Sequence, residues 1–241
     1  MWLWIIATLV AFYIKGLCGF ANTLVFTSIM GFGVSNVAIS PVELLLGYPS
    51  NLILTFNNRH KLNKYVYIPL AALVLVGSIP GAFLLKNVDA RYIKIVFGFV
   101  VILLGIEMFF REKKSRHMKE SKLILGIIGI LSGVLCGLFG VGALLAAYVG
   151  RVTKTSDEFK VNISAVFIVE NTFRIVIYSV LGIITLSNLK QALIMVPFML
   201  AGLFAGIKSG TILDEKIIKR LVIILLIISG VALILMNISF S

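Results

Sequence analysis

The sequence predicts an all-α integral membrane protein built from two inverted repeats, each with a glycine-broken, re-entrant first segment followed by three transmembrane helices. Of the 241 residues, 60% are hydrophobic and only 13% are charged, and the mean hydropathy is +1.08. A soluble domain carries about a quarter charged residues. Several apolar runs can cross roughly 30 Å of hydrocarbon, and the two halves of the chain resemble each other.

The repeat is visible when the chain is aligned with itself. At an offset of 125 residues, the pattern Gly-x7-Asp-x4-Lys-x10-Gly at 81–105 recurs at 206–230. A spaced pattern that recurs in register indicates duplication. We therefore expect a first transmembrane repeat at 1–112, a basic linker at 113–122 and a second repeat at 123–241. At an offset of 121, the aligned pairs are Gly16 with Gly137, Leu17 with Leu138, and Gly19 with Gly140.

Each half has a long apolar segment with a glycine-rich centre, followed by three ordinary spans. Residues 2–10 have no basic stretch before them and no small-residue cleavage site after them, so we expect them to belong to the mature protein. The expected segments are 2–34 (interrupted), 41–56, 65–85 and 92–110 in the first half, and 123–150 (interrupted), 161–187, 189–213 and 217–236 in the second.

The positions of the cations decide between single crossings and hairpins at the interrupted segments. If each interrupted segment crosses once, the loop lysines and arginines divide evenly between the two sides. If both are re-entrant, sixteen lie on one side and four on the other. Cytoplasmic loops carry such an excess of cations, so the hairpins are favoured. The linker at 111–122 is then cytoplasmic, and both termini are external.

This topology predicts a transporter. One hairpin plus three crossings is an odd number of crossings, so the two halves are inverted relative to each other. Inverted repeats with broken segments at matching positions are typical of secondary transporters whose site lies near the midplane. We therefore expect alternating access around a site between the repeats.

The first break, "KGLCGFAN", supplies candidate ligands for an anion. Irregular backbone at membrane depth lines a cavity or is buried in protein, and a helix that begins after a break attracts anions. An alternative role for the glycines is close packing of helices. The candidates are Lys15, Gly16, Gly19 and Asn22 in this break, and Gly137 and Gly140 in the second.

The stretch "VENTFRI" places two opposite charges in an apolar segment. Glu170 and Arg174 are four residues apart and share a helix face. Charges inside a membrane mark substrate or ion pathways, although a structural ion pair is the alternative. In the functional interpretation Arg174 faces an anionic substrate, and Glu170 holds Arg174 or carries a coupling proton.

Polar residues at the matching depth of the first half complete the candidate site. "YPSNL" aligns with "VENTF", which adds Ser50 and Asn51 to Asn171 and Thr172 as neutral hydrogen-bonding groups. We expect Glu43 and Glu107, near the ends of their spans, to reach the membrane interface.

Other classes of protein are less well supported. The net charge of +12 lies in loops between apolar spans and forms no aromatic and basic stripe, so no nucleic acid is expected. The motifs H-E-x-x-H and G-x-S-x-G are missing from the sequence, and no catalytic residue, metal or cofactor is expected. Cys18 and Cys136 are expected to be small packing residues without a disulfide.

The glycine-broken first segments, the "PSN"/"ENT" pair and the Gly-x7-Asp-x4-Lys pattern together resemble the sulfite exporter TauE/SafE family. The resemblance implies a repeated helical transporter of sulfite, thiosulfate or organosulfonates in the plasma membrane of a prokaryote. Protons and sodium are the candidate coupling ions. The alternatives are transport of another small oxyanion or carboxylate, or an intramembrane enzyme.

Overall fold

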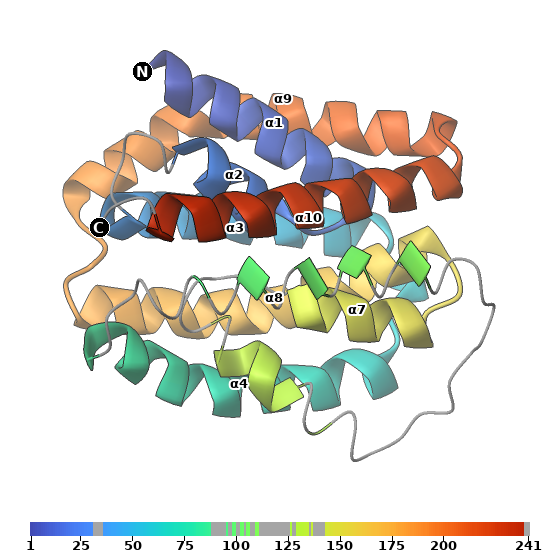
Figure 1. Cartoon of the computed structure of the whole chain (residues 1–241), viewed down its shortest axis with the longest axis horizontal. Helices are drawn as coiled ribbons and strands as arrows, with labels where there is room; N and C mark the ends of the chain where they lie inside the picture. Colours follow the sequence, from blue (N-terminus) through green and yellow to red (C-terminus); the bar gives the residue numbers. More distant parts are fainter. Residues whose placement is uncertain are drawn as a thin grey trace.

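The protein is all-helical wherever its structure is described (Figure 1). The computed structural model describes residues 1–30, 36–87, 95, 98–99, 102–103, 105–106, 109–110, 126, 129–134, 136 and 143–238. The linker and most of the second break lie outside these residues. The elements are α1 (Trp2–Cys18), α2 (Asn22–Met30), α3 (Asn36–Asn57), the 3-10 turn η1 (Arg59–Lys61), α4 (Lys64–Asn87), α7 (Ala143–Val152), α8 (Ser156–Val180), α9 (Leu186–Ile212) and α10 (Glu215–Ile238).

Two of these helices, α8 and α9, are long and apolar enough to cross a bilayer. They have 25 and 27 residues, about 38 and 40 Å at 1.5 Å per residue. Large apolar side chains on their outer faces are exposed, among them Val176, Leu193 and Phe204. An apolar outer surface on helices of this length fits a protein that lies in lipid.

The first segment is broken where the glycines predict. α1 ends at Cys18, and Gly19 caps it in the left-handed conformation with φ 84°. Ala21 is also left-handed, with φ 70°, and α2 begins at the next residue. Two such residues so close together redirect the chain, and α2 packs back against α1.

The predicted span 161–187 differs from the helix that forms there. α8 begins five residues earlier, because the Thr155 side chain accepts a hydrogen bond from the Glu158 backbone and caps the helix. It ends at Val180, and Gly182 turns the chain with φ 69°. The apolar residues 181–184, which resemble helix in the sequence, form the connection to α9.

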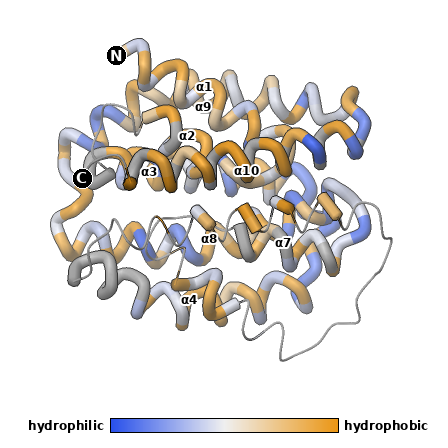
Figure 2. The backbone as a smooth tube through the Cα atoms, viewed as in Figure 1, coloured by the Kyte–Doolittle hydropathy of each residue, from blue (hydrophilic) through white to orange (hydrophobic). Residues whose placement is uncertain are grey.

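One end of the bundle, which we call the polar end, collects three of the connections between helices. Figure 1 shows the α3–α4, α7–α8 and α9–α10 connections at this end, and the α8–α9 connection at the other. Figure 2 shows hydrophilic stretches at the polar end, and others within α8 and at the opposite end. The start of α1 and the end of α10 lie at the end opposite the polar end. This grouping agrees with the distribution of loop cations, and the assignment of the polar end to the cytoplasm stays a prediction.

Glycines bring the helix backbones into close contact at two crossings. Where α1 crosses α9, a Cβ on Gly16 would overlap the carbonyl oxygen of Leu203, and a Cβ on Gly206 would overlap that of Tyr13. Where α4 crosses the helical residues 129–134, Gly77 and Gly133 meet in the same way. In both cases the third segment of one half, α4 or α9, packs against the interrupted first segment of the other half.

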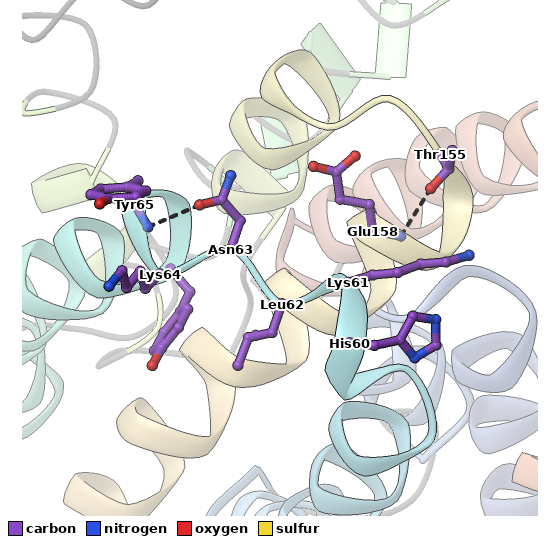
Figure 3. A pocket seen from close by; sticks show the side chains of 9 residues that line it. His60, Lys61, Leu62, Asn63, Lys64, Tyr65, Thr155 and Glu158 are labelled. Atoms are coloured by element: carbon purple, nitrogen blue, oxygen red, sulfur yellow. Dashed lines mark hydrogen bonds between the residues drawn. The ribbon is translucent and has the colours of Figure 1, made fainter.

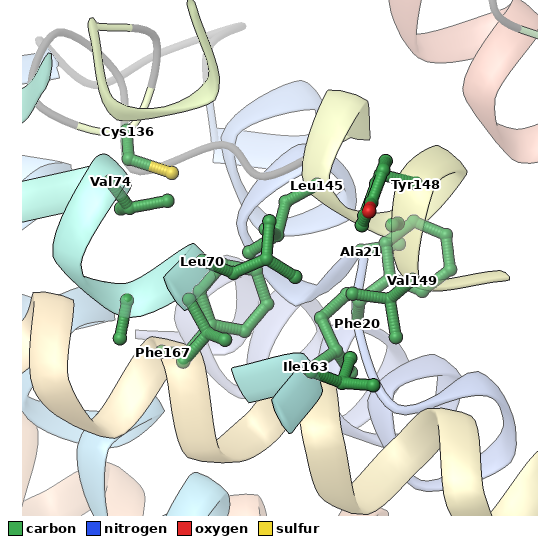
Figure 4. Packing of buried hydrophobic residues seen from close by; sticks show 14 of the residues in the cluster. Phe20, Ala21, Leu70, Val74, Cys136, Leu145, Tyr148, Val149, Ile163 and Phe167 are labelled. Carbon is green, nitrogen blue, oxygen red and sulfur yellow. The ribbon is translucent and has the colours of Figure 1, made fainter. Parts of the chain in front are cut away.

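Apolar side chains fill the space between α1, α2, α4, α7 and α8. Figure 4 shows Phe20, Leu70, Leu145, Ile163 and Phe167 packed together, with Cys136 at the edge of the group. Cys18 and Cys136 are both buried and unoxidised, in agreement with their expected packing role. α3 packs against α8 and α9, and α8 also packs against α4. The crossing of α3 and α8 is therefore enclosed by the other helices.

The α1–α9 crossing predicts a steric test. We expect Gly206→Val to lower the free energy of unfolding by about 1–3 kcal/mol, because the new side chain overlaps the Tyr13 backbone. Gly150→Ala is the matched control, since its Cβ would meet only ordinary contacts with Phe159 at 3.8 Å. Thermal unfolding in detergent measures both. Equal stability of the two variants would contradict the close contact.

The helix connections lie at two opposite ends of the bundle, and this predicts from which side of the membrane a thiol in each connection can be labelled. His60→Cys in the α3–α4 connection and Ser187→Cys at the start of α9 place thiols at exposed positions. We expect a membrane-impermeant maleimide to label the first only from the cytoplasm and the second only from outside. The native cysteines are buried and serve as the background. Labelling of both from one side would exclude this topology.

Candidate functional site

Charged and polar side chains gather where α3 and α8 cross, close to the break after α1. We call Lys15, Asn22, Thr23, Glu43, Ser50, Glu170, Asn171 and Arg174 the polar cluster, and each is at most 9% exposed. The sequence positions them simply. The left-handed break starts α2 at Asn22, and helical spacing puts Glu43 and Ser50 on one face of α3. The same spacing aligns Glu170 and Arg174 on α8.

Gly47 of α3 marks the centre of the cluster. A Cβ built on it would lie 3.5 Å from Oε1 of Glu43 and 3.7 Å from Nδ2 of both Asn22 and Asn171. Its missing side chain therefore leaves room where α2, α3 and α8 meet. The Gly47 carbonyl accepts hydrogen bonds from Ser50 Oγ at 2.7 Å and Lys15 Nζ at 3.4 Å.

Glu43 joins α3 to the first turn of α2. Its Oε1 accepts hydrogen bonds from Asn22 Nδ2 at 2.5 Å and Thr23 Oγ1 at 2.7 Å. A carboxylate buried in an apolar bundle is costly unless donors satisfy it. These two bonds also orient the polar side chains that follow the break.

Arg174 brings a second cation to the cluster from the other half of the chain. Its Nη2 donates to Asn171 Oδ1 at 3.2 Å, its Nη1 donates to the Cys136 carbonyl at 3.4 Å, and its Nε lies 3.5 Å from Glu170 Oε1. Neither Nε nor that Oε1 has a hydrogen bond within the described residues. The guanidinium is therefore held by two hydrogen bonds through Nη1 and Nη2, and through Nε by its charge contact with Glu170.

A separate hollow of about 680 Å³ lies at the polar end (Figure 3). His60, Lys61 and Lys64 line it together with Tyr65 and Glu158. One of these lining residues, Lys61, forms an ion pair with Asp157, in which Nζ and Oδ2 are 2.6 Å apart. This hollow is on the surface, whereas the polar cluster is buried, and it shares no residue with the cluster.

Comparison with known proteins identifies the family. The family model described as sulfite exporter TauE/SafE matches residues 4–233, nearly the whole chain. The chain belongs to the sulfite exporter TauE/SafE family. The resemblance seen in the sequence is thus confirmed. No curated protein and no solved structure matches the chain.

In this TauE/SafE protein, the structure brings together half of the residues predicted for the site: Lys15, Asn22, Ser50, Glu170, Asn171 and Arg174. Thr172 is not in the cluster: its side chain is exposed and donates a hydrogen bond to the Ile168 carbonyl. Asn51 is buried, but within the described part of the chain its Oδ1 has no hydrogen bond and its side chain forms none with the cluster. Gly137 and Gly140 lie outside the described residues, as does Glu107.

The two glycines of the first break have structural contacts. Gly16 lies in the α1–α9 crossing, which favours the packing alternative. Gly19 ends α1, and a Cβ on it would lie 2.8 Å from Cγ of Lys160. The atoms nearest to a Cβ built on either glycine belong to residues outside the polar cluster. A role of these glycines in binding stays a prediction.

The expectation that Glu43 reaches the membrane interface is wrong. It is 2% exposed and lies inside the cluster, because α3 extends back to Asn36 and places Glu43 two turns inside the helix. Thr23 and Gly47 were also not expected in the site. The sequence contains a pattern that indicates this grouping: Glu43, Gly47 and Ser50 are spaced by four and three residues, which puts them on one helix face.

The Glu170–Arg174 pair predicts a non-additive effect on stability. We expect Arg174→Gln to lower the free energy of unfolding by about 3–5 kcal/mol, because it leaves Glu170 buried without a cation. The double variant Glu170→Gln with Arg174→Gln removes both charges and should be less destabilised than Arg174→Gln alone. The free energies of unfolding of the native protein, the two single variants and the double variant are measured in detergent, and together they give the interaction energy of the pair. Additive losses would show that the two side chains do not form a pair.

Proposed function

We propose that this protein is a secondary transporter of small sulfur-containing anions, such as sulfite, thiosulfate or an organosulfonate, across the plasma membrane of a prokaryote. The observation that carries the proposal is a pair of buried cations, Lys15 and Arg174, which share one cluster with amide, hydroxyl and carboxylate side chains inside an apolar helical bundle. The chain belongs to a family described as sulfite exporters. Buried charges of this kind mark substrate pathways in membrane proteins.

Contacts between the halves support two repeats related by a two-fold axis. At the offset of 125 residues, Gly98 corresponds to Ile223 and Gly105 to Gly230. A Cβ on Gly98 would lie 2.7 Å from the Gly230 carbonyl oxygen, and one on Gly105 would lie 3.5 Å from that of Ile223. These two contacts exchange with each other under a two-fold rotation. The α4–α8 and α3–α9 contacts form a second such pair.

In this arrangement the polar cluster lies between the repeats and its residues have distinct roles. Arg174 presents a planar guanidinium suited to two oxygens of one oxyanion. Lys15 adds a point charge from the opposite repeat, and the Asn22 and Asn171 amides add neutral donors. Glu170 holds the guanidinium in place. Rocking of one repeat against the other would expose this site to each side in turn.

The proposal predicts anion transport that depends on Arg174. In liposomes containing the purified protein, we expect uptake of radiolabelled sulfite or thiosulfate, and a loss of at least tenfold in Arg174→Ala. The reason is that a buried, charge-assisted contact to the anion disappears. Competition with unlabelled sulfonates and carboxylates then ranks the sulfur-containing anions against other small oxyanions.

The matched control for this experiment is Lys190→Ala. It also removes one positive charge from the protein, but at an exposed position at the start of α9. We expect it to transport like the native protein. Size-exclusion profiles and melting temperatures confirm that both variants are folded. Full uptake by folded Arg174→Ala would exclude this residue from the site.

A further inference from the structure

Glu43 is a buried carboxylate whose bonding partners are neutral. Both of its hydrogen bonds come from uncharged donors, Asn22 and Thr23, and both end on the same oxygen, Oε1. Within the described residues it has no cation within 4.0 Å. Glu170 differs, because the Arg174 guanidinium lies 3.5 Å from it.

The charges facing Glu43 come from two elements. α1 contributes Lys15, and α8 contributes Glu170 and Arg174. α2 presents only neutral donors, and the α9 lysines, Lys190 and Lys208, are exposed. Cys18 on α1 and Cys136 are buried near the same cluster. The polar cluster therefore holds two cations and two carboxylates, with a formal charge of zero.

We propose that Glu43 takes up one proton when the anion binds, so that the site accepts a monovalent oxyanion together with one proton. This inference rests on the proposed transport function and narrows its substrate to monovalent species, such as a sulfonate or hydrogensulfite. A neutral cluster that receives an anion alone becomes a net buried charge, which is costly in an apolar interior. A proton on one of its carboxylates restores neutrality.

The geometry favours Glu43 over Glu170 as the residue that receives the proton. Because Asn22 and Thr23 both donate to Oε1, Oε2 can carry the proton while Oε1 remains an acceptor. Protonation of Glu43 thus keeps both contacts to α2. Glu170 lies 3.5 Å from the Arg174 guanidinium, and this neighbouring positive charge favours the ionised form of Glu170.

This mechanism also explains how charge selects the substrate. A monovalent anion with one proton leaves the cluster neutral. A divalent anion with one proton adds a net negative charge to the buried site, so it binds more weakly. The carried complex has no net charge, and transport is therefore insensitive to membrane potential and driven by a pH gradient.

The experiment measures affinity for methanesulfonate, which stays monovalent throughout the neutral pH range, by thermal protection of the purified protein between pH 5 and 9. In the native protein we expect the dissociation constant to rise up to tenfold per pH unit wherever Glu43 is ionised, because one proton is bound with each anion. In Glu43→Gln the dissociation constant should not change with pH, because the amide imitates the protonated acid and its oxygen still accepts from Asn22 and Thr23.

Two further variants separate Glu43 from other carboxylates. Glu170→Gln leaves the cluster one positive charge in excess and therefore also removes the need for a proton, so the charge-conserving variants Glu43→Asp and Glu170→Asp make the distinction. The infrared band of the carboxyl that becomes protonated on methanesulfonate binding should shift in Glu43→Asp and stay in place in Glu170→Asp. Glu158→Gln is the matched control at the polar end and should behave like the native protein. The proposal is overturned if the pH dependence persists in Glu43→Gln, or if the carboxyl band shifts in Glu170→Asp and not in Glu43→Asp.

A measurement on the native protein makes the test independent of any variant. In weakly buffered detergent solution, a pH electrode should record the uptake of one proton for each methanesulfonate bound. Binding without proton uptake overturns the inference and leaves the transport function intact. If native protein neither binds nor transports any sulfur-containing anion, the proposed function itself fails.

Discussion

Electrostatic balance inside an apolar bundle is the constraint on which the rest of this structure depends. A charged side chain in a hydrocarbon interior is stable only with partners that offset its desolvation. Lys15, Glu43, Glu170 and Arg174 are brought together from three helices and both halves of the chain. Each has contacts to a carbonyl, an amide, a hydroxyl or an opposite charge within the cluster. The crossing of α3 and α8 is thereby fixed by polar contacts as well as by apolar packing.

The surrounding glycines make this arrangement possible by allowing close approach of the backbones. At the crossing of α1 with α9, and of α4 with residues 129–134, carbonyl groups occupy the space that a methyl group would need. Gly47 has the opposite effect, because its missing side chain leaves room among Glu43, Asn22 and Asn171. Glycine thus allows close packing at the helix crossings, and at position 47 it leaves space among the polar side chains.

Much of the architecture could be predicted from the sequence, because it depends on local signals. Hydropathy predicts the helical class and the spans of α4 and α10, and Gly19 marks the break after α1, whereas α3 begins five residues before its expected start. The start of α8 was missed, because a Thr155 cap followed by acidic residues resembles a polar loop until the helix is seen. Glu43 was placed at the interface because burial depends on which helices cover a position, and sequence distance from a span end does not report that. Glu170 and Arg174 were found because two charges in an apolar run have few alternatives.

The left-handed alanine at the break has a consequence for molecular recognition. Ala21 adopts a backbone conformation that L-residues other than glycine rarely occupy, and such a residue persists only where its surroundings hold it. The corner between α1 and α2 is therefore a rigid part of the scaffold. Asn22 and Thr23 follow it directly, and their hydrogen bonds to Glu43 fix their side chains. Preorganised donors lose little conformational entropy on complex formation, so more of the interaction energy is expressed as affinity.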